Sequence, residues 1–377
     1  MHFDNLKMNM NKLLSIIVPS YNMEAYLPKC LRSLIIDDNE LLQTLDVIVV
    51  NDGSKDRTSE IAHEFAAKFP GVFRVIDKPN GHYGSCINAA LPNVVGTFVK
   101  ILDADDSFEP EGLKRLLIVI DSFSYDPKCE VDVIFTNKVR VNEDGVETAE
   151  RCLALPHEIP LPLEDLTDDF IASIWMHHVA YRASVFTKIN YKQLEGINFT
   201  DSQWVYNPMA CVRKVYCLPV VVYRYLLGRE GQSVSVYWKN LSHTRRVTEQ
   251  LMDDYDVLVA KSTIGGRAYL KARLYARIMV VYRYSLISNY RDLLPEEPQL
   301  IEFDNKCQRM QPDLYKRVEK VRYFQRVPIG YVKAWRKKVA GNPLQWWILK
   351  LLLQPIFKIW SSRYLRFCRR LLNKCEI

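Results

Sequence analysis

The chain has 377 residues, of which 48% are hydrophobic and 25% charged, and its formal net charge is +7. This is the composition of an ordinary globular protein with a sizeable core, and it excludes a chain that is disordered throughout. The charge is unevenly distributed, since residues 321–377 hold 13 Lys and Arg but a single acidic residue, Glu376. We therefore expect a mildly acidic folded body followed by a strongly basic tail.

Cysteine usage and apolar runs bear on the compartment. The nine cysteines are scattered without a CxxC pair, which favours reduced thiols over a zinc site or a disulfide framework. The N-terminal stretch has too short an apolar run for a signal peptide and lacks a small-residue cleavage site. The longest apolar stretch, WWILKLLL, is far shorter than the ~20 residues that span a bilayer. We expect a cytoplasmic protein.

Two sequence periods alternate through the first 140 residues. Strands are expected at 13–20, 46–52, 72–77, 97–103 and 131–141, and helices at 24–36, 56–69, 85–94 and 109–123. Continuous Val/Ile runs alternating with helices predict an α/β fold with a mostly parallel sheet covered on both faces. Ligands bind such sheets outside the carboxyl ends of the strands. The polar stretches PSYN, NDGSKD, KPNGHYGS and DADD follow the first four strands, so they predict one shared site.

The stretch DADD places Asp103, Asp105 and Asp106 at the end of a buried strand. Crowded carboxylates repel one another and lose hydration there, so a cation between them is expected. Mg²⁺ and Mn²⁺ prefer carboxylate oxygens and share their coordination with substrate phosphates. The alternative is that Asp106 or Ser107 caps the following helix, which explains one carboxylate rather than three.

Asp52 ends the second expected strand, where a carboxylate can accept hydrogen bonds from a base or a ribose. The alternative is a turn built from Asn51, Asp52 and Gly53, with a cap at Ser54 or Asp56. The sequence has neither G-x-G-x-x-G after the first strand nor a P-loop motif, so neither type of phosphate loop is supported. GHYGS, from Gly81 to Ser85, either approaches a ligand closely or only turns the chain.

Taken in order, SIIVPSYNMEAYLPKCLRSL, VIVVNDGSKDRT and ILDADD resemble the family 2 glycosyltransferases with the GT-A fold. KPNGHYGSCINAAL, FTDSQWVYNP and YRYLLGREGQSVS are similar to a bacterial subgroup of that family. The resemblance is strong over 13–111 and extends more weakly to 235. It implies a GT-A-like catalytic domain over 1–235. Beyond the resemblance, the residue pattern predicts a helical region over 236–320, followed by the basic tail over 321–377.

The resemblance also implies roles for individual residues. Those that would contact the nucleotide are Pro19, Ser20, Tyr21, Glu24, Asp52, Gly81, Ser85 and Asp103. Asp52 would hold the base. Asp103 would lie near the ribose and the metal, and Asp105 would be the main ligand of Mn²⁺ or Mg²⁺.

Inverting glycosyl transfer also requires a general base on the face of the sugar opposite the leaving group. The family's Glu-Asp pair corresponds here to Thr200 and Asp201, so the resemblance implies Asp201 as the base while the pairing is altered. The alternative is that Thr200 or Asp201 only caps a helix over 202–212.

Three further residues are weaker candidates for contacts with the donor or acceptor. His177, in MHHVAYR, lies where the subgroup has a histidine, and on a strand only one of the two adjacent histidines would face the site. A histidine of the core or surface is an equal alternative. Arg229 and Gln232, in GREGQSVS, could touch phosphate or acceptor from a loop over the donor, or belong to an ordinary solvated connection.

The basic tail contains four of the seven tryptophans, Trp335, Trp346, Trp347 and Trp360. At helical spacing one face would carry Leu353, Trp360, Tyr364, Phe367 and Leu371, with Lys358, Arg366 and Arg369 opposite. A basic segment rich in Trp and Leu is typical of helices at an anionic membrane surface. The alternative is a helix packed on the catalytic domain, and nucleic-acid binding is less favoured.

Together these features predict a metal-dependent inverting glycosyltransferase that moves one sugar from a nucleotide sugar, expected to be a UDP-sugar, to an acceptor hydroxyl. A lipid-linked glycan of a bacterial surface polysaccharide would suit an enzyme on the inner face of the membrane. A non-catalytic nucleotide-sugar-binding protein of the same fold is the alternative. A nucleotidyltransferase is disfavoured because PSYNMEAY offers no glycine-rich or basic phosphate loop. The sequence does not specify the sugar, the linkage or the oligomeric state.

Overall fold

A computed structural model describes residues 11–124, 129–149, 155–229, 232, 241–288, 293–322, 330–349 and 351. These residues form two compact units, the first from Met1–Val236 with Asp254–Lys271 and the second from Tyr237–Asp253 with Ala272–Ile377. Every candidate site residue belongs to the first unit.

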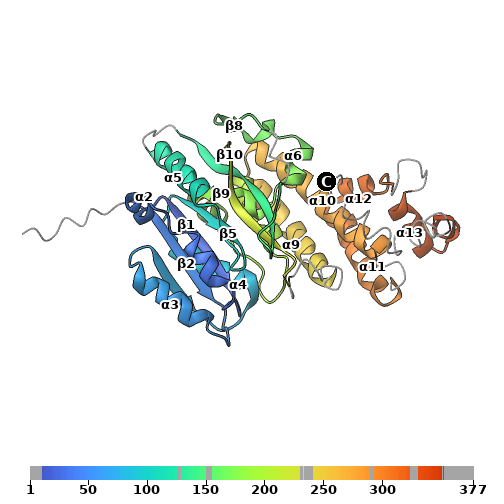
Figure 1. Cartoon of the computed structure of the whole chain (residues 1–377). Coiled ribbons are helices and arrows are strands. Elements are labelled where there is room, and N and C mark those ends of the chain that lie inside the picture. Colours follow the sequence, from blue (N-terminus) through green and yellow to red (C-terminus); the bar gives the residue numbers. More distant parts are fainter. Residues whose placement is uncertain are drawn as a thin grey trace, which may run out of the picture. The chain divides into compact units, whose positions relative to one another are not determined.

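A ten-stranded sheet, counted over the described residues, forms the centre of the first unit (Figure 1). The strands are β1 Leu14–Ser20, β2 Leu45–Asn51, β3 Phe73–Asp77, β4 Phe98–Ile101, β5 Ser107–Phe108, β6 Val131–Asn142, β7 Glu147–Ala149, β8 Pro160–Pro162, β9 Val179–Arg182 and β10 Lys214–Leu227. Their order is β3-β2-β1-β4-β9-β6-β10-β5, with β7 beside β6 and β8 beside β10.

Strand direction follows the apolar pattern. The strands β1 and β2 are buried along almost their whole length, as expected for a sheet covered on both faces. Parallel pairing joins β1 to β2 and β4, β2 to β3, and β6 to β10, whereas β9 lies antiparallel between β4 and β6. The predicted α/β class, with a mostly parallel first half and a helical C-terminal region, is confirmed.

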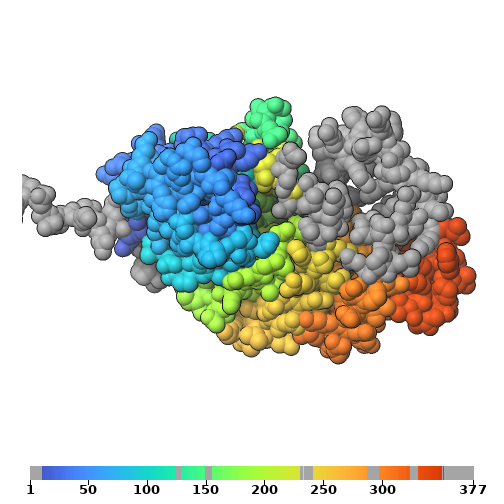
Figure 2. Space-filling model, turned by 90° about the horizontal axis from the view of Figure 1, so that it is seen from below, coloured from blue at the N-terminus to red at the C-terminus, as the bar shows by residue number. Residues whose placement is uncertain are grey.

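Helices cover the sheet. Those of the first unit up to residue 212 are α1 Leu27–Arg32, α2 Asn39–Gln43, α3 Thr58–Lys68, α4 His82–Ala90, α5 Pro110–Ser124, α6 Asp168–Ser173, α7 Ser184–Ile189 and α8 Asp201–Trp204, with short 3-10 turns η1 Leu91–Asn93, η2 Leu163–Asp165, η3 Met176–His178 and η4 Pro208–Cys211. The helix α3 packs on β3 and α5 on β10. In Figure 2 the residues coloured blue and cyan form one continuous surface.

Two predicted helices are shorter than expected. The helix expected at 24–36 begins only at Leu27, with Pro28 in its first turn, where a missing N–H costs nothing. The helix expected over 202–212 is broken into α8 and η4. Pro208 explains the break, because it has no N–H to donate to the preceding turn.

The register of the parallel strands brings the polar loops to one edge of the sheet. Ser20 is paired with Asn51, and Asn51 with Asp77, so β1, β2 and β3 end at the same level. Ile17 of β1 pairs with Ile101, the last residue of β4. The chain after each of these strands therefore leaves the sheet at its carboxyl edge, where a parallel sheet binds ligands.

The second unit is helical. Long helices α9 Leu241–Ala260 and α10 Ile264–Arg283 contribute residues to both units, and the π-turn Tyr284–Ser288, α11 Leu293–Met310, α12 Pro312–Val318 and α13 Tyr331–Val339 follow. Arg336 of α13 is bonded to Asp304 and Glu319 and lies over the ring of Tyr315, 3.5 Å from its centroid. This buried arginine joins α11, α12 and α13.

The start of the basic tail thus belongs to the helical unit. Trp335 and Trp346 are buried, so these two tryptophans of the tail pack inside the protein. Trp347 is exposed. The predicted face of Leu353, Trp360, Tyr364, Phe367 and Leu371, and the basic residues opposite, lie outside the described residues.

Two further observations concern the compartment. No helix in the described part of the chain is long and apolar enough to cross a membrane. The described cysteines Cys30, Cys86, Cys129, Cys211, Cys217 and Cys307 are free thiols.

Candidate active site

The DADD turn follows β4 and holds its three carboxylates in different environments. Asp106 is buried, and its carboxylate accepts hydrogen bonds from the Tyr223 hydroxyl at 2.7 Å and the Leu226 N–H at 2.7 Å. Both partners belong to β10, so Asp106 does not cap α5, as the alternative interpretation had it. The same Tyr223 hydroxyl accepts the Asp103 N–H at 3.1 Å.

Asp105 has a cationic partner from another loop. The Arg229 guanidinium donates from Nε to Asp105 Oδ2 at 2.8 Å, and both side chains are largely buried. The guanidinium also lies over the ring of Tyr26, 5.4 Å from its centroid. A cation from the chain therefore balances part of the charge of the turn.

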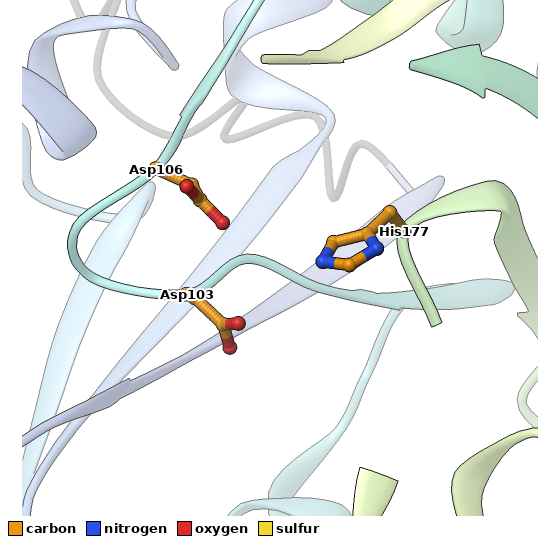
Figure 3. A group of neighbouring side chains, drawn as sticks. All are labelled: Asp103, Asp106 and His177. Atoms are coloured by element: carbon orange, nitrogen blue, oxygen red, sulfur yellow. The ribbon is translucent and has the colours of Figure 1, made fainter. Parts of the chain in front are cut away.

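The remaining two carboxylates meet His177. One ligand atom each of Asp103, Asp106 and His177 lies within 4.8 Å of the others, and a ring nitrogen of His177 points toward the carboxylates (Figure 3). His177 belongs to the 3-10 turn η3 and not to a strand, so the expected alternation of its side chain with that of His178 is wrong. Both histidines are buried.

Burial dominates the electrostatics of this cluster. Desolvation, followed by the charge of Asp105, raises the pKa of Asp103 and of Asp106 well above the usual range, and the charge of Asp201 adds to the rise at Asp103. Desolvation also lowers the pKa of the His177 imidazole well below its usual value, with the charge of Lys138 adding to the effect. The imidazole is therefore neutral.

Lys100 of β4 is a fully buried ammonium beside this cluster. Its Nζ donates to the carbonyl oxygens of His177 at 2.7 Å and Val179 at 3.2 Å, and it lies 5.9 Å from the centroids of the Phe108 and Tyr223 rings. Burial lowers the pKa of Lys100 to about 7. It ties the turn that carries His177 to the strand that leads into DADD.

Asp52 is buried at the end of β2. Its Oδ1 accepts hydrogen bonds from Lys78 Nζ at 2.7 Å, the Gly81 N–H at 2.9 Å and Ser85 Oγ at 3.4 Å. The predicted turn at Asn51, Asp52 and Gly53 is also present, since Asn51 Oδ1 accepts the Ser54 N–H. Asp52 thus fastens the loop before α4 to the carboxyl end of β2, and Gly81 and Ser85 lie beside it.

The loop after β1 is fastened to the loop after β2. Glu24 accepts the Arg57 N–H at 3.0 Å, and the Glu24 N–H donates to Asp56 at 3.0 Å. Ser20 is buried, whereas Tyr21 is exposed. The predicted nucleotide residues Pro19, Ser20, Tyr21 and Glu24 thus form one rim of the carboxyl edge.

Asp201 begins α8 behind an N-cap residue, Thr200, whose side chain makes no capping bond. Thr200 Oγ1 instead accepts from Gln193 Nε2 at 2.9 Å. Trp204, one turn further on, is fully buried and stacked on Phe186 with 4.7 Å between ring centroids. These contacts fix a four-residue helix that would not be stable alone.

Gln232 lies close to the end of β10. Its Nε2 donates to the Leu226 carbonyl, and its Oε1 accepts the Gly228 N–H at 3.3 Å. The side chain thereby holds the chain that leads to Arg229. Of the two loop residues predicted to touch a ligand, Arg229 reaches the acidic turn and Gln232 is bonded to backbone.

Four residues of the site were not predicted from the sequence. Tyr83 donates from its hydroxyl to Asp103 Oδ1 at 3.0 Å, and Lys78, Lys100 and Tyr223 hold the carboxylates or the backbone around them. GHYGS marked the neighbourhood of Tyr83, but only the glycines and the serine stood out. No local signal distinguishes the other three from core residues.

The comparisons agree with this arrangement. The model of Glycosyl transferase family 2 matches residues 15–152. An uncharacterized glycosyltransferase of Mycoplasma pneumoniae, the MG060 homolog, is 34% identical over 235 residues, covering 60% of this chain and 72% of the relative. Another from Mycoplasma genitalium, MG025, is 23% identical over 303 residues, covering 78% and 88%.

Among solved structures, S. aureus TarS 1–349 in complex with UDP-GlcNAc has a TM-score of 0.57 at 20% identity, over 80% of this chain and 82% of that one. At that identity the likeness shows the fold. The family model covers β1 to β4 and the acidic turn that follows β4. This chain belongs to glycosyl transferase family 2 and is a glycosyltransferase.

Proposed function

We propose that the enzyme is a metal-dependent inverting glycosyltransferase that moves a single sugar from a nucleoside diphosphate sugar to an acceptor hydroxyl. Family membership supports the reaction class. The UDP-GlcNAc bound by TarS supports a UDP-sugar as donor. The acceptor we propose is a glycan, such as a lipid-linked one in bacterial surface polysaccharide synthesis.

The observation that carries the proposal is the position of Asp201. Its charge adds to the rise in the pKa of the Asp103 carboxyl, after burial and the charge of Asp105, which supports a position of Asp201 near the acidic turn. Asp103 comes from the strand edge and Asp201 from a separate helix. A donor at the acidic turn would therefore lie near the carboxylate of Asp201, which we propose as the base for the acceptor.

In the proposed reaction the acceptor hydroxyl oxygen attacks the anomeric carbon from the face opposite the diphosphate. The new carbon–oxygen bond forms as the bond from the anomeric carbon to the diphosphate oxygen breaks, and the nucleoside diphosphate leaves with the electron pair. Asp201 accepts the proton of the attacking hydroxyl. The anomeric configuration is inverted as a result.

The acidic turn fits a divalent cation, because carboxylate oxygens of Asp103 and Asp106 lie within 4.8 Å of each other and of a ring nitrogen of His177. Asp103 and Asp105 are the ligands we propose from the family pattern. A bound Mn²⁺ or Mg²⁺ would stabilise the negative charge that develops on the diphosphate. Arg229, now paired with Asp105, can offer its guanidinium to a phosphate oxygen.

The nucleoside would lie against the rim formed by the loops after β1 and β2. Asp52 and Glu24 order this rim through backbone N–H groups, which supports their proposed role near the base. Gly81 and Ser85 would approach the nucleotide from the loop before α4. Tyr21 is exposed and available for stacking.

The test is the Asp201→Asn variant, which keeps the shape of the side chain and removes the base. Turnover of a UDP-sugar should fall ~10²–10⁴-fold while the affinity for UDP changes little. Glu195→Gln, an equivalent change in the segment before Asp201, is the matched control and should leave turnover intact. A non-catalytic protein of the same fold would bind UDP without turnover in the wild type, and normal turnover in Asp201→Asn would refute the assignment of the base.

We also propose that the enzyme is peripheral on an anionic membrane surface. Residues 344–349 and 351 are helical, and Leu344, Trp347, Ile348 and Leu351 are exposed at the spacing of one helical face. The basic residues of 321–377 that are not paired within the helical unit, as Arg336 and Lys338 are, would add electrostatic attraction. Flotation with anionic vesicles should fall in Trp347→Ala combined with Leu351→Ala, and unchanged flotation would refute this location.

A further inference from the structure

The buried side of the acidic turn contains two potential ligands, Asp106 and His177, that the family pattern does not use. We propose that His177 supplies a nitrogen ligand to the divalent cation, together with carboxylate oxygens of Asp103 and Asp106. This inference rests on the metal dependence proposed above and names the residues that select the metal. Asp105 would complete the set from the other side once Arg229 turns to the diphosphate.

The geometry of the three side chains suits a single ion. Their ligand atoms lie within 4.8 Å of one another, and the imidazole approaches from a segment of its own, opposite the two carboxylates (Figure 3). At metal–ligand distances of about 2.1 Å, two atoms bound to one octahedral ion lie about 3 Å apart if adjacent and about 4.2 Å if opposite. Side-chain rotations that move each ligand atom by less than about 1 Å would bring the atoms to these separations. Movements of this size are common when a preorganised site binds its ligand.

His177 lacks the hydrogen bond that a buried imidazole normally has. Its Nε2 is the nitrogen that faces the carboxylates, while Nδ1 lies on the other side of the ring and is buried without a hydrogen-bond partner among the described residues (Figure 3). The side chain is about nineteen-twentieths buried. Buried polar groups are bonded in the great majority of cases, so a buried imidazole that has no side-chain hydrogen bond among the described residues and aims Nε2 at two carboxylates needs an explanation. An imidazole nitrogen and two carboxylate oxygens that face one another can share a cation.

The surrounding structure holds His177 in this position. Its ring is packed between Tyr223 and Tyr225, with centroid distances of 4.6 Å and 4.7 Å. Its carbonyl accepts from Lys100 Nζ at 2.7 Å. Since Lys100 lies on β4, the strand that leads into the acidic turn also fastens the turn that carries the histidine.

Asp106 can bind a cation without losing its present partners. Its Oδ1 accepts the Leu226 N–H, and its Oδ2 accepts the Tyr223 hydroxyl. An ionised carboxylate offers about four lone-pair positions, so each oxygen keeps one for a metal. Tyr223 and Leu226 would then act as outer partners that orient the ligand, as in many metal sites.

A nitrogen ligand has a consequence for metal choice. Mg²⁺ is a hard ion that favours oxygen ligands, whereas imidazole suits first-row transition ions better. The site should therefore prefer Mn²⁺ to Mg²⁺, and removal of the imidazole should weaken this preference.

The experiment uses Mn²⁺ alone and with UDP, on the full chain. Electron spin-echo envelope modulation should detect a directly bound nitrogen in the wild type and in His178→Asn, and none in His177→Phe. Phenylalanine preserves the ring packing, and His178→Asn keeps an acceptor where Nδ1 of His178 now accepts the Trp175 N–H. Isothermal titration should show Mn²⁺ bound at least about tenfold more weakly by His177→Phe, by analogy with the effect of lost outer partners.

The outcomes separate this inference from the proposed function. Mn²⁺ bound without a nitrogen ligand in the wild type overturns the inference alone, and this spectrum decides even if His177→Phe does not fold. Equal affinity in folded His177→Phe overturns it as well. If Mn²⁺ does not bind even with UDP, and EDTA leaves turnover intact, the metal dependence itself is refuted.

Discussion

The ion pair of Asp52 and Lys78 should couple the stability of the first unit to the loop that frames the nucleotide. Lys78 Nζ lies 2.7 Å from Asp52 Oδ1, and the side chains are only 19% and 3% exposed. At an effective dielectric constant of about 20 the attraction is about 6 kcal/mol before desolvation is subtracted. Contacting buried groups retain about 0.5–3 kcal/mol of coupling in double-mutant cycles, and we expect the upper half of that range here.

The cycle consists of Asp52→Asn, Lys78→Met and the double variant, each measured by urea unfolding. Asp52→Asn should cost about 3–5 kcal/mol, because it leaves a mostly buried ammonium without its counter-charge. The double variant should cost less than the sum of the two single ones. Additive single effects, with a coupling energy below about 0.5 kcal/mol, would refute the view that this pair holds the loop before α4.

Two further predictions concern the acidic turn. Tyr83→Phe removes the hydroxyl that donates to Asp103, so we expect turnover to fall about fivefold to tenfold, the equivalent of about 1–1.4 kcal/mol. The stability of the protein without bound donor should change little. A steady-state assay and thermal unfolding check the two expectations, and unaltered turnover would contradict the first. Arg229→Ala removes a positive charge 2.8 Å from Asp105. In calorimetry, Mn²⁺ without nucleotide should therefore bind about threefold to tenfold more tightly, while the UDP-sugar should bind more weakly. A change of both affinities in the same direction would contradict this prediction.

Much of the fold follows from local patterns in the sequence. Runs such as LSIIVPS and LDVIVVN are strands because their β-branched residues are apolar on both faces. The loops that follow them could be assigned to one edge, because parallel strands share their direction. Pro28 and Pro208 mark the two helices whose extents were overestimated, and each does so through its missing N–H.

The inner half of the site depends on pairings that no local pattern contains. Asp106 is bonded to Tyr223 and Leu226, more than a hundred residues further along the chain. His177 lies in a 3-10 turn whose orientation is set by the buried Lys100. The sequence predicts a cation site at the acidic turn, but which side chains gather on each side of the turn depends on how β4, β9 and β10 are ordered in the sheet.

The central claim is that a nucleoside diphosphate binds through a metal at the acidic turn. Calorimetric titration of UDP, GDP, dTDP and CDP, each with Mn²⁺ and with EDTA, tests it on the wild type and Asp103→Asn. We predict that UDP binds in the presence of Mn²⁺, and that binding is lost with EDTA and in the variant. Equal binding in EDTA, or no nucleotide binding under any condition, would contradict the account.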